Sequence, residues 1–382
     1  MAQVWIPSFR NRVMLEALGL FARATRRRAP TAPTLSGRVE RILVIELWNI
    51  GDIVLAMPFL AQLRTLFPQA TITMLARSYA RTVLAGTDLV DDFIDTDLGW
   101  SASAVRHNPF AYRWIELARI RKALKRGRFD VAFSSRMHVR EYVLLALSGA
   151  ERKVAFALGH GEKVLTDAIP LVDPNRHKTA DWLELLKPFG GPVTQDAPRL
   201  KTSEVERQRA RTFLAANGIT TENCLVGIHP GASVPAKRWP LERFAEVARA
   251  ITRMPEIKVL AFVSPDGYGQ QLAQIPGVIS ADVGLRELIA LVECCDVLAC
   301  NDSGPMHIAG ALGVPTVSIF GSGINRWFSP IGDRHFLLTA EGVGGSNPSA
   351  SAVIPFDVAG VSTSQVLAAL GEAIGLTMPV HP

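Results

Sequence analysis

Short apolar runs alternate along this chain with longer stretches in which apolar residues recur every three or four positions. The short runs predict buried strands, and the longer stretches predict helices with one apolar face. The alternation starts at residue 41 and is interrupted once, by a glycine- and proline-rich stretch at residues 190–198. Because strands that alternate with helices form parallel sheets, we predict an α/β protein with two doubly wound, Rossmann-like sheets in series.

The interruption marks the expected domain boundary. A chain of 382 residues is long for one core and suits two domains. We place the first domain at residues 41–200 and the second at residues 201–345. Residues 1–40 are then an extension and linker, and residues 346–382 are a tail.

Each domain contains its own succession of elements. In the first domain we expect strands at residues 41–47, 70–77, 91–97, 129–135 and 153–157, and helices at residues 53–67, 111–125 and 139–147. In the second we expect strands at residues 224–229, 257–263, 278–283, 297–301 and 316–320, and helices at residues 241–253, 268–275 and 285–294. Ligands of open α/β folds bind at the carboxyl ends of the strands, so polar residues just after these strands are the candidates for function.

Three turns of the second domain are rich in small and polar residues. Two of them follow the apolar runs at residues 297–301 and 316–320. Their polar and glycine residues are Asp302, Ser303, Gly304, Gly321 and Ser322. The third turn, at residues 229–240, offers the hydroxyl of Ser233 and the ammonium group of Lys237. Backbone amides, a hydroxyl and a cation at one edge of a sheet together predict a cradle for a diphosphate.

Asp52 follows the first strand, at the point where a helix begins. Aspartate is a preferred N-cap and contributes about 1 kcal/mol to helix stability in that position. A carboxylate at the carboxyl end of a strand also faces the ligand-binding edge, where a general base is needed. The sequence leaves both roles open for Asp52.

A cationic group comes directly after the expected strand at residues 129–135. It consists of Arg136, His138 and Arg140. Cationic side chains at a ligand-binding edge suit a substrate that carries phosphate or carboxylate groups. These residues either bind an anionic acceptor or belong to a solvated loop.

The net charge is concentrated at the amino terminus. The formal charge is +6, and residues 1–38 contain seven arginines and one glutamate, which gives +6 for this segment and zero for the rest of the chain. A general nucleic-acid binder would spread its cations over the body, so we expect no nucleic acid as a partner. Residues 8–28 predict an amphipathic helix with an arginine-rich side. That helix either rests on anionic lipid at the inner membrane surface or packs on the protein itself.

Composition also bears on where the protein works. No apolar run approaches the length of a membrane span, so we expect a soluble body. The cysteines are Cys224, Cys294, Cys295 and Cys300, and they lack the spacing of a metal site. Reduced thiols and a cytoplasmic location follow. If residues 8–28 bind lipid, the protein would be peripheral on the inner face of the cytoplasmic membrane.

Three segments in this order carry a family resemblance: RILVIELWNIGDIVLAMPFLAQLRTLFPQATI, GASVPAKRWPLERFAEVARAI and NDSGPMHIAGALGVPTVSIFGSG. The chain resembles glycosyltransferase family 9, the ADP-heptose:lipopolysaccharide heptosyltransferases, over roughly residues 41–330. The resemblance implies the GT-B fold, with the donor nucleotide in the second domain and a terminal helix that returns to the first. Residues 362–374 are the candidate for that helix, because Ser362 and Gln365 have the spacing of a capping box.

The resemblance also implies roles for individual residues. Asp52 would be the general base that deprotonates the acceptor hydroxyl. On the donor side, Ser233, Lys237, Ser303 and Gly304 would contact the diphosphate, Asp302 and His307 the sugar, Val283 the nucleobase and Asp266 the ribose. A structural hydrogen bond is the alternative role of His307.

The implied reaction is inversion at the anomeric carbon, with helix amides and Lys237 in place of a metal ion. Asp95-Thr96-Asp97 matches the DxD pattern of metal-dependent glycosyltransferases, but a pattern of this length arises easily by chance. We therefore expect no metal and no cofactor. The expected donor is a nucleotide-diphospho-sugar, ADP-heptose by resemblance, and the expected acceptor is lipopolysaccharide core or another envelope glycan.

Two other functions stay open. A non-hydrolysing nucleotide-sugar epimerase has the same fold, but it needs further acid and base carboxylates, which the three segments do not show. A non-catalytic module that binds a nucleotide or a glycan would follow if Asp52 were only a helix cap.

Overall fold

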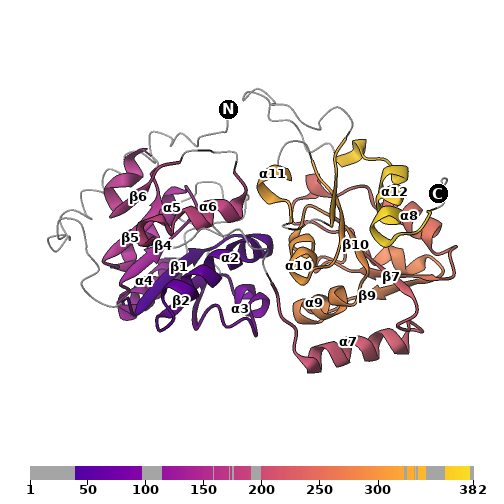
Figure 1. Ribbon diagram of the computed structural model, residues 1–382, viewed down its shortest axis with the longest axis horizontal. Helices are drawn as coiled ribbons and strands as arrows, with labels where there is room; N and C mark the ends of the chain where they lie inside the picture. Colours follow the sequence, from indigo (N-terminus) through magenta and orange to yellow (C-terminus); the bar gives the residue numbers. More distant parts are fainter. Residues whose placement is uncertain are drawn as a thin grey trace. The chain divides into compact units, whose positions relative to one another are not determined.

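The chain forms two compact units (Figure 1), which are Met1–Gln195 and Asp196–Pro382. The division falls within the glycine- and proline-rich stretch at residues 190–198. The computed structural model describes residues 39–96, 114–157, 159–171, 173, 176–190, 199–321, 325–330, 332, 334–340 and 358–378. The predicted amphipathic helix at residues 8–28, Asp97 and Ser322 lie outside the described residues.

The first unit contains a six-stranded parallel sheet in the order β3-β2-β1-β4-β5-β6. Its strands are β1 (Arg41–Glu46), β2 (Thr71–Ala76), β3 (Asp92–Asp95), β4 (Val131–Phe133), β5 (Arg152–Phe156) and β6 (Asp167–Ile169). Its helices are α2 (Ile50–Leu66), α3 (Tyr79–Val83), α4 (Trp114–Gly127), α5 (Val139–Ser148) and α6 (Lys178–Glu184), with 3-10 helices η3 (Gly159–Val164) and η4 (Lys187–Phe189). The strand order reverses between β1 and β4, which makes their carboxyl ends a topological switch point.

The second unit repeats this topology in the order β12-β11-β10-β7-β8-β9. Its strands are β7 (Cys224–His229), β8 (Ile257–Phe262), β9 (Val278–Ala281), β10 (Val297–Asn301), β11 (Thr316–Ile319) and β12 (His335–Leu338). Its helices are α7 (Glu204–Ala216), α8 (Leu241–Ile251), α9 (Leu285–Glu293), α10 (Gly304–Leu312), α11 (Asn325–Phe328) and α12 (Thr363–Ile374), with 3-10 helices η5 (Pro235–Lys237), η6 (Gln270–Gln274) and η7 (Val358–Gly360). The switch point of this sheet lies between β7 and β10. The prediction of two Rossmann-like sheets is confirmed.

The central strands explain the apolar runs of the sequence. In β1, residues 42–45 have no exposed surface, and in β10 every residue is buried. Helices cover both faces of a parallel sheet, so both sets of side chains along such a strand are apolar. Each of these strands nevertheless ends in a fully buried polar residue, Glu46 in β1 and Asn301 in β10. These two buried polar residues lie at the switch points of the two sheets.

Several elements differ from the sequence prediction, and two strands and one helix illustrate why. The strands β6 and β12 were not expected, because they are short, lie at the edges of their sheets and keep partly exposed side chains. The helix expected at residues 268–275 is the 3-10 helix η6. Gly267 and Gly269 precede η6 with φ angles of 78° and 99°, a left-handed conformation that an α-helix does not contain.

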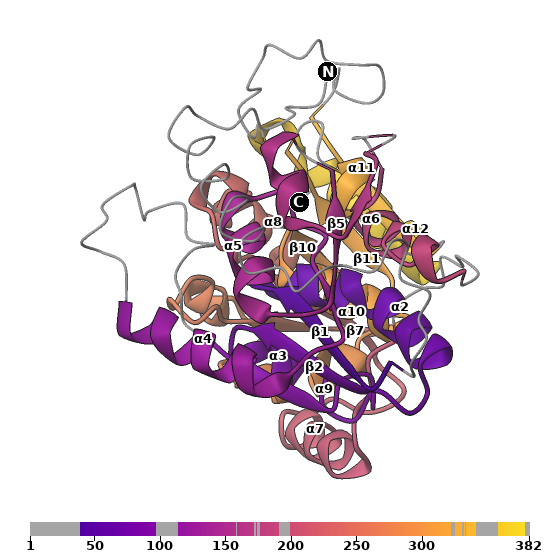
Figure 2. The ribbon, with the colours of Figure 1, turned by 90° about the vertical axis from the view of Figure 1, so that its left-hand side faces the viewer.

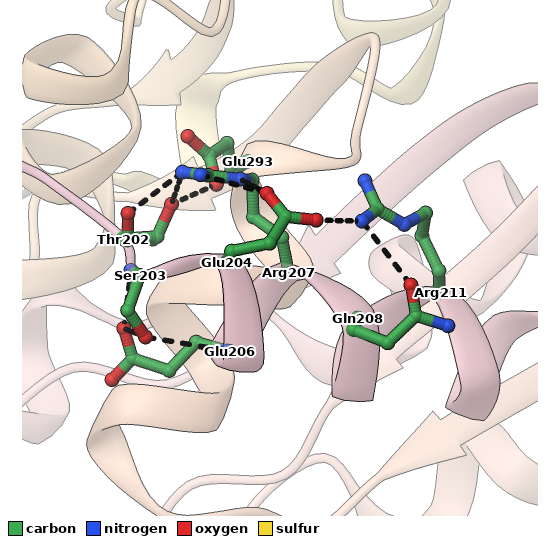
Figure 3. Close-up of polar contacts among 8 residues, drawn as sticks. All are labelled: Thr202, Ser203, Glu204, Glu206, Arg207, Gln208, Arg211 and Glu293. Atoms are coloured by element: carbon green, nitrogen blue, oxygen red, sulfur yellow. Dashed lines mark hydrogen bonds and ion pairs between the residues drawn. The ribbon is translucent and has the colours of Figure 1, made fainter.

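Polar contacts hold the start of α7 on α9 (Figure 3). The Thr202 hydroxyl donates to the carboxylate of Glu293, and Arg207 Nη1 donates to the Thr202 carbonyl oxygen at 2.7 Å. Ser203 caps the helix, because its Oγ accepts from the amide of Glu206 at 3.3 Å. These contacts therefore fix α7, the first helix of the second unit, to α9 of the same unit.

The terminal helix α12 is present and belongs to the second unit. Its capping box forms as predicted, with Gln365 N donating to Ser362 Oγ at 3.2 Å. Its return to the first unit stays a prediction; within the second unit the helix packs on α8, β10, β11 and β12. The reason is its apolar face, which joins the core of that sheet through Val366, Leu367 and Leu370. Trp239 Nε1 strengthens the attachment by donating to the Val361 carbonyl oxygen at 2.9 Å.

Leu370→Ala should lower the free energy of unfolding by about 2–5 kcal/mol, because it opens a cavity in a fully buried part of this core. Leu376→Ala is the control, since Leu376 follows the same helix but is 36% exposed and should cost less than about 0.5 kcal/mol. Denaturant unfolding measures both. Equal losses would contradict the packing of α12 on the second unit.

Candidate active site

Asp52 lies at the first switch point, in the first turn of α2. Asn49 is the N-cap of that helix, so the interpretation of Asp52 as the N-cap is wrong. Asp52 instead closes the cap from the third helical position, where its Oδ2 accepts from Asn49 N at 2.9 Å. Its Oδ1 forms an ion pair with Arg136. The carboxylate is thus held at both oxygens.

Arg136 stands among three carboxyl groups. Besides Asp52, its guanidinium approaches Glu46, with Nε 3.7 Å from Oε2, and stacks on the Trp48 ring at 4.9 Å from the centroid. The Trp48 indole Nε1 donates to Glu141 Oε1 at 2.8 Å, and its backbone amide donates to Glu46 Oε1 at 2.9 Å. Glu46 and Glu141 are buried. The cluster therefore joins the ends of β1 and β4 through one cation.

Burial changes the ionisation of this cluster. It raises the pKa of Glu46 and of Glu141 well above the usual range of a glutamate, and the charge of Arg136 only partly offsets this. Burial acts to lower the pKa of Arg136, but the charges of Asp52, Glu46 and Glu141 raise it above its ordinary value. The guanidinium is thus a permanent cation, whereas the two glutamates tend to hold protons.

The three residues predicted to bind an anionic acceptor, Arg136, His138 and Arg140, have different surroundings in the structure. Arg136 is engaged by the carboxyl groups of its own domain. His138 caps α5, with Nδ1 accepting from Arg140 N at 3.3 Å. Burial and the nearby charge of Arg140 lower the pKa of His138 to about 4, so this imidazole is neutral at pH 7. Acceptor binding by His138 and Arg140 stays a prediction.

The second switch point brings Lys237 and Asp302 together. Lys237 Nζ lies 2.5 Å from Asp302 Oδ2, and the Asp302 side chain is 7% exposed. Asn301, which the sequence analysis missed, ties the two turns to each other. Its Oδ1 accepts from Trp239 N at 3.0 Å, and its Nδ2 donates to the Pro230 carbonyl oxygen at 2.6 Å. A polar residue at the last position of a fully buried strand was the signal for Asn301.

Buried polar atoms surround this second switch point. Among the described residues, His229 Nδ1, Ser264 Oγ and Ser303 Oγ are buried without a hydrogen-bond partner. Gly231 passes so close to Ser264 that a Cβ atom would lie 1.7 Å from its Oγ. The turn after β7 therefore requires glycine at this position. Polar atoms of this kind are suited to a polar ligand.

Ser303 and Gly304 begin α10 as predicted, with Ser303 at the N-cap and Gly304 in the first turn. The helix N-terminus offers free amides and a partial positive charge to an anion. His307 is buried further along the same helix, and Gly321 is buried just after β11. Ser233 is exposed in the turn before η5.

Asp266 and Val283 lie elsewhere on the second unit. Asp266 forms an ion pair with Arg238 at 2.5 Å, and this hydrogen bond lowers the pKa of the carboxyl. The Arg238 guanidinium stacks on Tyr268, 4.4 Å from the ring centroid. Val283 lines a hollow of about 120 Å³ bordered by residues of α7 and α9. The predicted ribose and nucleobase contacts of Asp266 and Val283 stay predictions.

No described helix combines the length and the apolar character needed to cross a bilayer. Within the same part of the chain, histidine, cysteine, aspartate and glutamate side chains form no group of three or more that could bind a metal ion. Asp95, the described member of the DxD pattern, forms an ion pair with Arg81 at 3.3 Å.

Comparisons with known proteins agree with this architecture. A family model described as glycosyltransferase family 9 (heptosyltransferase) matches residues 117–343. Lipopolysaccharide heptosyltransferase 2 of Salmonella typhimurium is 25% identical over 316 residues, which are 77% of this chain and 86% of that protein. Lipooligosaccharide heptosyltransferase 2 of Haemophilus influenzae is 26% identical over 327 residues, which are 78% of this chain and 88% of that protein.

Solved structures show the same fold. A family 9 glycosyltransferase from Veillonella parvula superposes with a TM-score of 0.72 at 23% identity, covering 88% of this chain and 98% of that one. The ADP-heptose lipopolysaccharide heptosyltransferase II of Escherichia coli superposes with a TM-score of 0.66 at 20% identity, covering 87% of this chain and 98% of that one.

Glu46→Gln should change how stability depends on pH. The pKa of Glu46 is higher in the folded than in the unfolded state, so the folded protein keeps a proton that the unfolded chain releases. The free energy of unfolding of the wild type should therefore fall as the pH rises from about 4.3 toward the raised pKa. Glutamine has no proton to lose, so the variant should lack this part of the decline.

Denaturant unfolding across this pH range measures the effect. Glu246→Gln, an exposed position on α8, is the control and should keep the slope of the wild type. A Glu46→Gln slope equal to that of the wild type would contradict the raised pKa.

Proposed function

The chain belongs to glycosyltransferase family 9, and on this premise we propose that it transfers a heptose from ADP-heptose to the core of lipopolysaccharide. It is a glycosyltransferase with the GT-B fold, built from two Rossmann-like units. The names of the relatives from Salmonella typhimurium and Haemophilus influenzae support heptose as the sugar and a lipopolysaccharide or lipooligosaccharide as the acceptor class. The name of the Escherichia coli structure supports ADP-heptose as the donor.

One observation carries the proposal: the switch points of the two sheets hold complementary chemistry. The first holds a carboxylate, Asp52, that is fixed by a cation and a backbone amide. The second holds the cation Lys237 and the amino terminus of α10. A base and a diphosphate site are the two requirements of transfer from a nucleotide sugar to a hydroxyl.

On the donor side, the leaving group is a nucleoside diphosphate, which must be neutralised as the sugar departs. Lys237 supplies a full charge, and the first amides of α10 supply hydrogen bonds and a partial charge. Ser303 Oγ is buried without a partner among the described residues, so it has a donor proton to give to a phosphate oxygen. Asp302, held beside Lys237, would contact the hydroxyl groups of the sugar.

On the acceptor side, Asp52 takes the proton of the attacking hydroxyl. The acceptor oxygen forms a bond to the anomeric carbon from the face opposite the diphosphate. The bond from that carbon to the phosphate oxygen breaks, and the diphosphate leaves with the electron pair. The configuration at the anomeric carbon is inverted in this single displacement. Arg136 keeps the Asp52 carboxylate oriented, because it pairs with the oxygen that the helix cap does not use.

Asp52→Asn should lower kcat by about 100- to 10,000-fold, because an amide cannot accept the proton. The amide oxygen can still accept from Asn49, so the helix cap is kept and the fold should survive. Donor binding, measured by calorimetry with ADP-heptose, should change by less than about threefold, since Asp52 and the donor site belong to different sheets. Wild-type turnover by Asp52→Asn would exclude Asp52 as the base.

Turnover should be unchanged after treatment with a chelator such as EDTA, because Lys237 and α10 neutralise the diphosphate in place of a divalent cation. Asp95→Asn, in the DxD pattern, should likewise keep kcat within about threefold of the wild type, as expected of an exposed ion pair. Product formation with ADP-heptose and a core fragment is the assay. Activity that vanishes in chelator and returns with Mg²⁺ or Mn²⁺ would contradict metal-independent transfer.

A further inference from the structure

A cationic hollow lies on the first unit, apart from the residues assigned to transfer. It has a volume of about 640 Å³, and its only uncharged lining residue is Ala118. The other lining residues are Arg41, Arg121, Lys122, Lys125, Arg126 and Arg128. Most of them belong to α4, the long purple helix across the front of the first unit in Figure 2. Among the described residues, the hollow is thus lined by six cations and by no carboxylate.

Two carboxylates near this hollow have partners outside it. Glu116 pairs with Arg119 at 2.6 Å, and Asp130 Oδ2 accepts from the backbone amides of Glu40 and Arg41 at 2.7 and 2.8 Å. In the part of the chain that the structure describes, the five cations of the hollow other than Arg41 form no ion pair. Mutual repulsion of unpaired cations is unfavourable, so their grouping calls for an anionic partner.

The outward side of α4 combines these cations with an apolar residue. Ile115 is 89% exposed, and it lies on the same side of the helix as Ala118, Lys122 and Lys125, which follow at helical spacing. On the opposite side, Ile120 and Leu124 are buried in the core. An exposed apolar residue beside a row of lysines and arginines is typical of helices that lie on a lipid surface.

The arrangement fits a surface better than a small anion. The hollow lies at the carboxyl end of α4, where Arg41 Nη1 donates to the Gly127 carbonyl oxygen at 3.1 Å, so no free helix amides face it. Four of its cations are long side chains spaced along α4, at residues 121, 122, 125 and 126. A helix C-terminus favours cations, but that effect is confined to the last turn and does not account for Lys122, Arg128 or Arg41.

We propose that the outward side of α4 and its hollow dock on the anionic phospholipid surface of a membrane. Each lysine or arginine close to such a surface contributes attraction to its negative potential, and Ile115 can enter the interface. This inference does not depend on the transfer reaction. Residues 1–38, which carry +6 by sequence, join the described chain at Val39, two residues before Arg41 of the hollow.

The direction of α4 relates this surface to Asp52. The helix follows β3 and precedes β4, so it runs back along the sheet, and its Trp114 end is level with the carboxyl ends of the strands. Its 14 residues span about 21 Å, close to the length of β1. A bilayer along α4 would lie parallel to the strands and would leave the edge with Asp52 beside the lipid. Such an orientation suits an acceptor that is itself anchored in the membrane.

Co-sedimentation of the full chain with lipid vesicles tests the proposal. The wild type should bind vesicles of phosphatidylcholine and phosphatidylglycerol, bind vesicles of phosphatidylcholine alone much more weakly, and lose affinity as salt is raised. The combined variant Lys122→Gln, Lys125→Gln and Arg126→Gln should bind the anionic vesicles roughly 100-fold more weakly. Ile115→Ser should weaken binding by a smaller factor, because only an apolar contact is lost.

A matched control variant distinguishes the loss of the α4 cations from a general loss of positive charge. Arg209→Gln, Arg249→Gln and Arg253→Gln remove the same charge from exposed positions of the second unit and should leave vesicle binding within about threefold of the wild type. Thermal unfolding should be unchanged in both triple variants, because all six positions are exposed. Equal losses in the two variants, no loss in the α4 variant, or equal binding to neutral and anionic vesicles would each overturn the proposal.

Discussion

The buried guanidinium of Arg136 is the constraint on which the first half of the active site depends. Moving a cation out of water costs several kcal/mol, and only nearby carboxylates and an aromatic face can offset this. The structure supplies Asp52, Glu46 and Trp48 for that purpose. These residues lie at the end of β1 and the start of α2, whereas Arg136 follows the adjacent strand β4, so the cation fixes the relative positions of the two segments that it joins. A carboxylate held in this way needs little reorganisation when it accepts a proton.

At the switch point of the second unit, a neutral residue joins the neighbouring segments, where a cation does so in the first unit. Asn301 occupies the end of β10 as Glu46 occupies the end of β1, and both are fully buried. An amide can donate and accept, so Asn301 joins two turns without adding charge. This leaves the charge of Lys237 to be balanced by Asp302. One topology thus carries a paired carboxylate, Asp52, in one copy and a lysine–aspartate pair, Lys237 and Asp302, in the other.

Sequence patterns predicted the elements and the strand-end residues, but not their partners. The runs that became β1 and β10 were recognisable because strands buried on both faces are continuously apolar. Glu141 gave no signal, since it is an ordinary helical residue until folding brings it 2.8 Å from the Trp48 indole. The packing of α12 was equally hidden, because an apolar helix face does not specify which of two cores it joins. Long-range contacts of this kind lie beyond what periodicity encodes.

The hydrogen bonds of Thr202 show how the second unit is held together from its first helix. Its hydroxyl and carbonyl are bound by Glu293 and Arg207, both of which lie later in the chain. The second unit also contains its own six-stranded sheet and terminal helix. Among the described residues, the partners named here all belong to the second unit, so the contacts that hold its first helix, its sheet and its terminal helix lie within that unit.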